Sequence, residues 1–182
     1  MKMYEATAEA VLIARVPGSF ITRREAGLDV ELAGIPGDRH YGLLRPADSR
    51  QRFYPRGTMV ANRRQISIVS VEECARVAAK LGIAELLPEW LGANILLSGY
   101  EELTSLPQGA RLLFPDGAGL ICEGENAPCT DAGQAIAEAE GIPGIKTAFV
   151  KAAYRMRGIV CSVEREGMIR QGDPVKIMIE GV

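Results

Sequence analysis

The sequence predicts a mainly β fold, a closed β-barrel with a few α-helices at its periphery. Two observations support this prediction. Many short segments have the composition and alternation of β-strands and are separated by turns, whereas only two or three segments have a helical pattern. The chain has 182 residues, enough for one hydrophobic core, and contains no internal repeat or evident linker. We therefore expect a single domain over residues 1–182.

The first half of the chain contains three predicted strands and one predicted helix. The strands cover residues 11–16, 29–32 and 65–69. The helix begins with the capping box Ser70-Val71-Glu72-Glu73 and runs to about Gly82. Its apolar face includes Cys74, which we expect to be a buried core thiol. Residues 84–90 are expected to form a short helical turn.

The second half continues the strand pattern. Strands are predicted at residues 93–97, 111–114 and 120–123. The end of the chain is the most regular part, because apolar residues alternate over residues 158–164 and again over 175–179. Residues 168–170 continue this pattern between two glycine-containing turns. Cys122 and Cys161 lie in these strands, and we expect both to be core thiols.

Residues 45–62 interrupt the pattern. They form a long polar stretch that is rich in arginine and has little strand or helix periodicity. Long segments without regular structure are uncommon in compact domains and are usually functional or mobile. We therefore expect a functional loop here.

The composition excludes several classes of protein. The net charge of −2 gives no reason to expect a nucleic-acid partner, and no apolar stretch approaches the roughly 20 residues that a membrane span needs. The start of the chain does not resemble a targeting segment. The four cysteines form no Cys-x-x-Cys pair, and a single histidine leaves few zinc patterns. We expect a cytoplasmic protein with free thiols.

Positive charge is nevertheless concentrated in two segments. Residues 39–64 contain one acid, Asp48, and seven arginines: Arg39, Arg45, Arg50, Arg52, Arg56, Arg63 and Arg64. Residues 146–157 contain two lysines, two arginines (one of them Arg157) and no acid. Arginine binds phosphate and carboxylate groups in a bidentate manner, so we expect a small anionic ligand. The alternative is a solvated surface loop.

Cys129 differs from the other cysteines because it lies between a Gly/Pro loop and a predicted helix. Asp131 and Gln134 are interpreted as a capping pair, and the helix is expected to end at Gly141. A cysteine at the positive end of a helix favours the thiolate form. Such a thiolate is a nucleophile, a sulfur carrier or a soft metal ligand, although a purely structural thiol remains an alternative.

Residues 34–42 form a second candidate element. Their glycines and proline predict a defined turn that presents Asp38, Arg39 and His40. His40 is the only histidine, so any imidazole acid–base chemistry must occur there. Alternatively, His40 only forms hydrogen bonds to the loop backbone. Asn94, at the start of a predicted strand, either orients a ligand or satisfies a turn.

Five short runs, taken in order, resemble the MOSC domain, the C-terminal domain of molybdenum cofactor sulfurases, which also occurs as stand-alone bacterial proteins. The runs are Gly-Ile-Pro-Gly-Asp-Arg-His-Tyr-Gly at 34–42, Arg-Gln-Ile-Ser at 64–67, Leu-Gly-Ala-Asn-Ile at 91–95, Ala-Pro-Cys at 127–129, and Arg-Gly-Ile-Val at 157–160 with the later Gly167 and Gly172-Asp173. The resemblance covers most of the chain, from about Gly34 to Val175.

This resemblance implies a β-barrel with peripheral helices and a role in molybdenum chemistry. The family's cysteine, which matches Cys129, carries sulfur or binds molybdenum in the pterin cofactor, and some stand-alone members are linked to reduction of N-hydroxylated bases. Thiolate suits molybdenum as a soft ligand. Family descriptions also mention pyridoxal phosphate, which we attribute to the sulfurase domain of larger relatives. Members that hold the cofactor firmly usually carry an additional N-terminal barrel domain, for which too few residues precede Gly34.

Three hypotheses follow. In the first, Cys129 is the molybdenum ligand or sulfur carrier and His40 is a second catalytic residue. Anionic cofactor groups are then bound or flanked by Asp38, Arg39, Arg63, Arg64, Asn94 and Arg157. This hypothesis implies a redox partner or a cysteine desulfurase, and an oligomer is possible. In the second, the barrel binds an anion or a pterin without catalysis. In the third, a thiol redox protein uses Cys122 to resolve Cys129.

Overall fold

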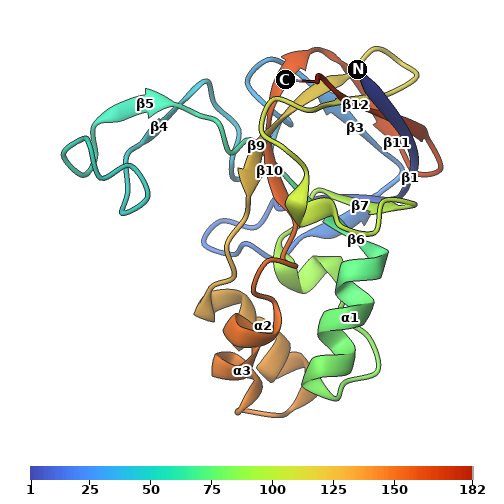
Figure 1. Ribbon diagram of the computed structural model, residues 1–182. Helices are drawn as coiled ribbons and strands as arrows, with labels where there is room; N and C mark the ends of the chain where they lie inside the picture. Colours follow the sequence, from blue (N-terminus) through green and yellow to red (C-terminus); the bar gives the residue numbers. More distant parts are fainter. Residues whose placement is uncertain (182) are drawn as a thin grey trace.

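The structure, a computed structural model, describes residues 1–181 and contains a closed β-barrel. The barrel strands are β1 (Lys2–Ile13), β6 (Ile66–Ser70), β7 (Ile95–Ser98), β8 (Arg111–Leu113), β9 (Gly119–Glu125), β10 (Ile159–Arg165) and β12 (Pro174–Ile179). They are hydrogen-bonded in the order β12-β8-β9-β10-β6-β7-β1, and a further pairing of β12 with β1 closes the sheet (Figure 1). The mainly β prediction is therefore confirmed.

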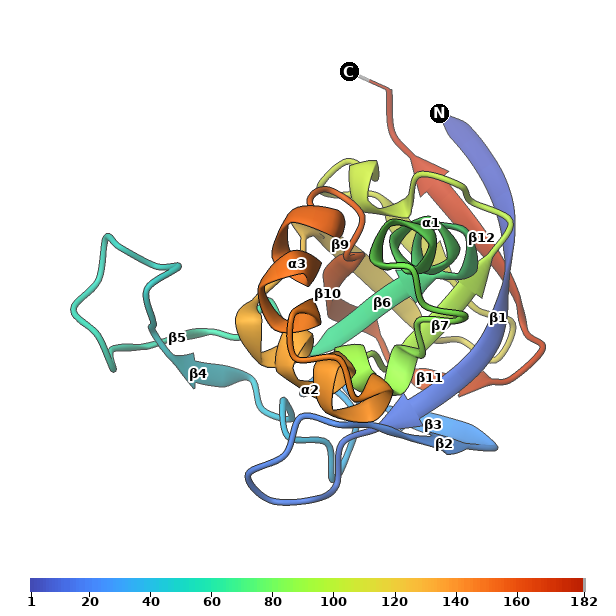
Figure 2. The same cartoon turned by 90° about the horizontal axis from the view of Figure 1, so that it is seen from below.

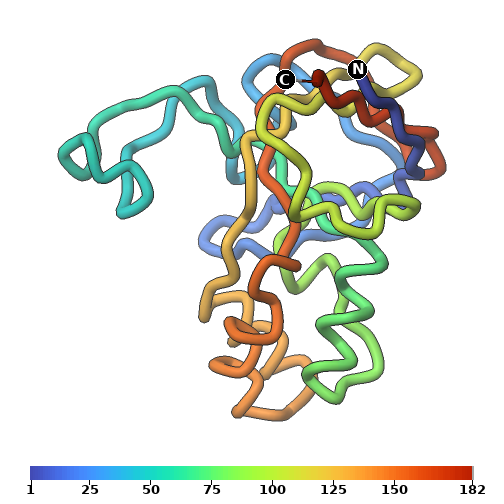
Figure 3. The backbone as a smooth tube through the Cα atoms, viewed as in Figure 1, coloured from blue at the N-terminus to red at the C-terminus, as the bar shows by residue number. Residues whose placement is uncertain are grey.

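The remaining strands lie outside this closed circle. They are β2 (Arg23–Glu25), β3 (Gly27–Val30), β4 (Leu44–Pro46), β5 (Met59–Ala61) and β11 (Gly167–Arg170). Strand β2 extends the main sheet beside β1, and β3 pairs with β11. The two ends of the chain lie close together at the top of the barrel in Figure 3, as the pairing of β1 with β12 requires.

The strand predicted at residues 11–16 overlaps β1 only at residues 11–13, the end of that strand. The first residues of β1 are exposed and do not alternate, so hydrophobic periodicity could not reveal them. They are strand because Lys2–Thr7 pair with β12 through the backbone. In contrast, β6 is buried along its whole length and was predicted to within one residue.

The expectation of a long segment with little regular structure at residues 45–62 is correct for residues 47–58, which contain no helix or strand, and wrong for the two ends. Strands β4 and β5 pair there as an antiparallel hairpin, with Leu44, Arg45 and Pro46 opposite Ala61, Val60 and Met59. We call residues 44–61 the arm. Figures 1 and 3 show the arm projecting from the side of the barrel. Each strand has only three residues, and β4 contains arginine and proline, so neither strand gives an alternating apolar pattern that the sequence could reveal.

Three α-helices and two 3₁₀ turns complete the fold: α1 (Val71–Leu81), η1 (Pro88–Leu91), η2 (Leu103–Ser105), α2 (Thr130–Glu140) and α3 (Ile145–Ala152). Helix α1 has the predicted cap, because the Ser70 hydroxyl accepts a hydrogen bond from the backbone N–H of Glu73. Helix α3 lies in the predicted basic segment and was not anticipated. No helix within residues 1–181 is long and apolar enough to cross a membrane.

The N-cap residue of helix α2 lies two residues before the predicted one, Asp131. Its N-cap residue is Cys129, and Asp131 lies in the first turn. Gln134 does not bond to the N-terminus but donates to the Glu138 carboxylate at 2.7 Å. The predicted cap at Asp131 is thus wrong, because the first helical residue is Thr130 and the N-cap residue is Cys129. Its predicted end is correct, since Gly141 adopts the left-handed conformation, with a φ of 68°.

Two hydrophobic cores result from this arrangement. One fills the barrel and contains Cys122 and Cys161. The other lies among α1, α2 and α3 and contains Cys74. Figure 2, viewed from below the barrel, shows the three helices grouped beneath its floor with the arm to one side. The candidate functional site lies at the junction of the barrel, the helices and the arm.

Candidate functional site

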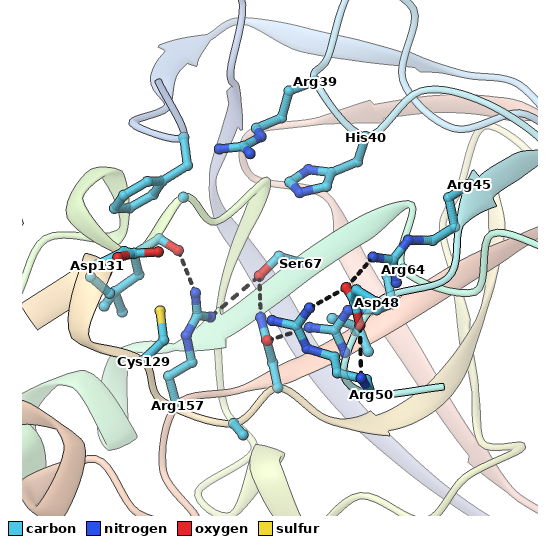
Figure 4. Close-up of a pocket in the computed structure, with 17 residues that line it drawn as sticks. Arg39, His40, Arg45, Asp48, Arg50, Arg64, Ser67, Cys129, Asp131 and Arg157 are labelled. Atoms are coloured by element: carbon cyan, nitrogen blue, oxygen red, sulfur yellow. Dashed lines mark hydrogen bonds and ion pairs between the residues drawn. The ribbon is translucent and has the colours of Figure 1, made fainter. Parts of the chain in front are cut away.

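A cavity of about 330 Å³ lies where the arm, the end of the barrel and helix α2 meet. Its lining residues are Phe20, Arg39, His40, Arg45, Asp48, Arg50, Arg64, Ser67, Leu91, Gly92, Asn126, Ala127, Cys129, Asp131, Ala132, Arg157 and Val160. Figure 4 shows Cys129 and Asp131 at one side of this cavity and Arg45, Asp48 and Arg50 at the other. We call it the arginine pocket.

Cys129 lines this pocket, and of the four cysteines it is the one that is partly exposed. The other three cysteines are free and buried. Burial raises the pKa of Cys74 to about 12, and burial also raises the pKa values of Cys122 and Cys161 above the ordinary range. Those thiols are therefore inert core residues, as predicted, whereas Cys129 is accessible at the N-terminus of α2.

Arg157 precedes β10 and is almost fully buried beside Cys129. Its Nη2 donates to the carbonyl of Leu91 at 2.6 Å, and its Nη1 lies 3.5 Å from the Ser67 hydroxyl. Its Nε is buried and has no hydrogen-bond partner within residues 1–181. Burial lowers the pKa of Arg157 to about 10, against the opposing effect of the nearby Cys129. A buried cation with an unsatisfied donor favours an anionic partner.

Arg64 lies on the opposite wall, just before β6. Its Nη2 donates to the Oδ1 of Asn126 at 2.7 Å. Burial, together with the charges of Arg50, Arg45 and Arg157, lowers its pKa to about 10. This mutual effect indicates that positive charges from three parts of the chain converge on one cavity, as the concentration of arginines in the sequence predicted.

Asp48, which follows strand β4 in the arm, offsets part of this charge. It accepts hydrogen bonds from Arg45 Nη2 and Arg50 Nη1, both at 2.6 Å, and from the backbone N–H of Arg50 at 2.8 Å. These donors outweigh partial burial, which acts the other way, and bring the pKa of Asp48 to about 2. Asp48 thereby fixes the two arm guanidinium groups at the mouth of the pocket.

Asp38 does not reach the pocket. It is buried, and its Oδ2 accepts from the Ala14 backbone N–H at 2.9 Å and from Asn94 Nδ2 at 3.0 Å. Its Oδ1 accepts from the His40 backbone N–H at 2.9 Å and lies 3.2 Å from His40 Nδ1. Burial opposes ionisation, but these bonds and the His40 charge hold the pKa of Asp38 below its usual value. Asp38 thus positions His40 rather than a ligand.

His40 itself lines the pocket. An ionised carboxylate only accepts hydrogen bonds, so Asp38 favours the tautomer with the proton on Nδ1. The other ring nitrogen, Nε2, is then the one able to exchange a proton in the cavity. The ring of His40 thus contacts the Asp38 carboxylate rather than the loop backbone and also lines the pocket, and acid–base chemistry at His40 stays a prediction.

Two other predicted site residues lie away from the pocket. Asn94 is a buried brace, because its Oδ1 accepts from the Ser67 backbone N–H at 3.0 Å while its amide donates to Asp38. The side chain of Arg63 is 74 % exposed on the other side of the chain and pairs with Glu123 at 3.3 Å. Arg39, in contrast, is exposed and lines the pocket.

Sequence reasoning missed some of the lining residues. Ser67 and Asn126 form a polar floor, since Asn126 Nδ2 donates to the Ser67 hydroxyl at 3.2 Å. Both are buried polar residues. Ser67 interrupts the apolar pattern of the strand predicted at residues 65–69, and Asn126 follows the strand predicted at residues 120–123, which is the signal that could have revealed them. Arg45 and Arg50 belonged to the predicted basic segment but could not be assigned to the site before the arm was known.

The arrangement can bind an anion beside a thiol. Arg64, which is half-buried, and Arg157, which is buried, supply guanidinium groups, and Cys129 supplies a sulfur at the same cavity. Within residues 1–181 there is no group of three or more His, Cys, Asp or Glu side chains placed to hold a metal ion by themselves. A metal bound here would therefore arrive with ligands of its own.

Comparison with known proteins identifies relatives over nearly the whole chain. A Bacillus subtilis (strain 168) protein named "Putative metal-sulfur cluster biosynthesis proteins YuaD" is 48% identical over 177 residues, which cover 97% of this chain and 92% of that one. The crystal structure of YuaD from Bacillus subtilis superimposes with a TM-score of 0.95 at 47% identity and covers 99% of both chains.

More distant structures share the fold. YiiM from Geobacillus stearothermophilus matches with a TM-score of 0.63 at 14% identity, over 97% of this chain and 77% of that one. YiiM from Escherichia coli matches with a TM-score of 0.57 at 12% identity, over 100% and 72% of the two chains. The family model of the MOSC domain matches residues 40–176, which include His40, Arg64, Cys129 and Arg157. The chain therefore belongs to the MOSC domain family.

Proposed function

We propose that the arginine pocket binds the molybdenum cofactor or a related phosphate-bearing pterin, and that the Cys129 thiol acts there as a molybdenum ligand or as a sulfur carrier. One observation carries this proposal. Of the four cysteines, only Cys129 is partly exposed, and it lines the same cavity as the half-buried Arg64 and the buried Arg157.

The residues present fit an anionic cofactor. Arg157 Nε and Arg45 Nη1 are buried donors without a partner within residues 1–181, and phosphate oxygens would satisfy both. The cavity of about 330 Å³ lies at the lower end of the range for small-molecule sites. A thiolate is also the kind of soft ligand that molybdenum accepts.

Each pocket residue has a defined role in this proposal. Arg64 and Arg157 bind the phosphate, and Asp48 orients the arm guanidinium groups of Arg45 and Arg50 toward it. His40 Nε2 exchanges a proton with a substrate, while Asp38 holds the ring. The bound cofactor supplies the redox chemistry, for which reduction of N-hydroxylated compounds is the substrate class we favour. Such a reaction needs an electron donor, which a separate redox protein would provide.

The sulfur-carrier role is a single thiol exchange. The Cys129 thiolate attacks the outer sulfur of a donor persulfide, forming one S–S bond as the donor's S–S bond breaks. The products are a Cys129 persulfide and the donor thiolate, so no external oxidant is required. A cysteine desulfurase is the class of protein that would present such a persulfide. The name of the Bacillus subtilis relative, which refers to metal–sulfur cluster biosynthesis, is consistent with this role.

Two quantities test the proposal in protein purified from a bacterium that makes the cofactor. One is molybdenum per chain, measured by elemental analysis, and the other is the intact mass, which reports an added sulfur atom. We expect wild type to carry molybdenum or the extra sulfur and Cys129→Ala to carry neither. Equal amounts in both proteins, or neither signal in wild type, would refute it.

Neighbouring arginines provide a matched control. Arg64→Met removes a guanidinium group from the pocket, whereas Arg63→Met removes one that faces away from it and pairs with Glu123. We expect Arg64→Met to lose the bound cofactor and Arg63→Met to retain it. Equal loss in both variants would indicate a general charge effect rather than the pocket.

A second candidate function is a barrel that binds a small anion or pterin without catalysis. The convergence of Arg45, Arg64 and Arg157 favours it, because these residues bind an anion whether or not the thiol reacts. Arginine-dependent affinity that survives Cys129→Ala, without molybdenum or persulfide, would select this function. Both candidates assume a reducing compartment such as the cytoplasm, since the four cysteines are free thiols.

A further inference from the structure

The arm has little support from its own chain. Its strands β4 and β5 pair as a separate two-stranded sheet. Its apolar side chains face outward: Phe53 is 97 % exposed, and Leu44, Tyr54 and Met59 are exposed as well. An isolated two-stranded hairpin is at best marginally stable in water. Exposed apolar residues gathered on one such element indicate an interaction surface.

The charge of the arm narrows the choice of partner. Besides Arg45 and Arg50, which pair with Asp48, the arm tip carries Arg52 and Arg56. Both are exposed, and neither forms an ion pair within residues 1–181. The tip is therefore apolar and positively charged, and it would bind a surface that is apolar and acidic.

This chain itself offers such a surface. A groove of about 790 Å³ adjoins the arginine pocket and is lined by apolar side chains, two carboxylates and one guanidinium group. The apolar lining includes Phe20, Ile21, Trp90, Ala135 and Ala139, the carboxylates are Asp131 and Glu138, and the guanidinium group is that of Arg39. Both carboxylates are exposed, and neither forms an ion pair within the described part of the chain.

The position of this groove suggests a reciprocal arrangement. Phe20, Arg39 and Asp131 line both the groove and the arginine pocket. The arm residues Arg45 and Arg50 line the same pocket from the opposite side, as Figure 4 shows. A two-fold axis near the pocket mouth would therefore carry the arm of each copy onto the groove of the other. Such isologous contacts are the commonest route to closed dimers.

We propose that two copies of this chain form a dimer in which the arm of each copy lies in the α2 groove of the other. Phe53 and Tyr54 pack against the apolar groove, and Arg52 and Arg56 lie near Asp131 and Glu138. The partner's arm then covers the mouth of the arginine pocket, so that each pocket is completed by residues of both copies. This inference does not depend on the ligand that the pocket binds.

The first experiment measures mass in solution by light scattering and sedimentation over a range of concentrations. We expect a dimer for wild type and a dissociation constant raised roughly 30-fold or more by Phe53→Asp, because a central aromatic residue commonly dominates an interface. Tyr154→Asp is the control, since Tyr154 is 69 % exposed but lies beyond α3, away from arm and groove. A monomeric wild type, or equal dissociation constants for the two variants, would overturn the proposal.

The second experiment identifies the contact directly. In a Cys129→Ser background, one chain carries Phe53→Cys and another carries Ala135→Cys, and the two are mixed and treated with a short thiol cross-linker. We expect a covalent heterodimer from this mixture and little from the control mixture of Tyr154→Cys with Ala135→Cys. Equal yields in the two mixtures, or no covalent heterodimer from the first, would overturn the proposed contact.

Discussion

Asp38→Asn tests whether one buried carboxylate holds the pocket-facing loop to the barrel. Each Asp38 oxygen accepts from two donors: Oδ2 from the Ala14 backbone and Asn94, and Oδ1 from the backbone and the ring of His40. Asparagine has nearly the same shape but replaces one acceptor with an amide group that only donates. The substitution thus changes the hydrogen bonding without creating a cavity.

The magnitude follows from the number of donors that lose an acceptor. If the amide nitrogen replaces Oδ2, both the Ala14 N–H and the Asn94 amide lose theirs. If it replaces Oδ1, the His40 ring can shift its proton to Nε2 and accept, so only the His40 backbone N–H is left unsatisfied. A lost hydrogen bond to a charged group costs about 1.5–3 kcal/mol. The side chain adopts the orientation that leaves one donor unsatisfied, so we expect a loss of about 1.5–3 kcal/mol in the free energy of unfolding.

Chemical denaturation measures this loss, with Asp116→Asn as the control. Asp116 is 51 % exposed and pairs with Arg170 on the surface, where an ion pair contributes about 0–1 kcal/mol. A loss of less than 1 kcal/mol in Asp38→Asn, or a loss equal to that of the control, would refute the account of Asp38 as a brace.

The same variant has a defined pH dependence. Because the pKa of Asp38 is lowered on folding, its ionised form stabilises the protein at pH values above 3.8, the ordinary value. That contribution is lost as the pH falls from 3.8 through the lowered pKa of the folded state. The difference in stability between wild type and Asp38→Asn should therefore be full at neutral pH and shrink in this acidic window. A difference that grows on acidification would contradict this assignment.

Three further predictions concern other parts of the fold. Iodoacetamide should alkylate only Cys129 in the folded protein, as peptide mass mapping would show, and labelling of a second cysteine would contradict the burial described above. Gly158→Ala should lower the free energy of unfolding by more than about 3 kcal/mol, because the added Cβ would lie 2.1 Å from the Ile68 carbonyl oxygen. Gly172 also has a positive φ but has open space around it, so Gly172→Ala should cost only roughly 1 kcal/mol. Similar losses for the two variants in chemical denaturation would refute the steric argument. Arg157→Met should weaken pyrophosphate binding roughly 10- to 100-fold in a calorimetric titration, and unchanged affinity would remove Arg157 from the site.

Much of the fold could be predicted because its strands carry local signals. Strand β6 is entirely buried and contains three β-branched apolar residues, and α1 has a capping box, so both were evident from sequence. The first half of β1 is exposed and is held by backbone pairing with β12, which leaves no hydrophobic pattern. The arm was missed for a similar reason, since its strands bury no alternating face.

The site was partly predictable for physical reasons of the same kind. Cys129 and Arg157 stand out by their chemical type and flanking residues, and both line the pocket. Adjacent side chains such as Arg63 and Arg64 look alike in sequence, but they point to opposite sides of the chain, which only the fold determines. Asp38 and Asn94 were predicted to line the site. Both are buried instead, and their hydrogen bonds hold the loop that carries His40 and strand β6 in place.

The central claim is that Cys129 and the arginines act on one bound molecule, and protection of the thiol tests it most directly. The rate of Cys129 alkylation is measured with and without the phosphate-bearing pterin released from a denatured molybdenum enzyme, in wild type, Arg64→Met and Arg63→Met. We predict that the pterin slows alkylation in wild type and in Arg63→Met but not in Arg64→Met. An alkylation rate that the pterin leaves unchanged in wild type, or slows equally in Arg64→Met, would contradict the claim.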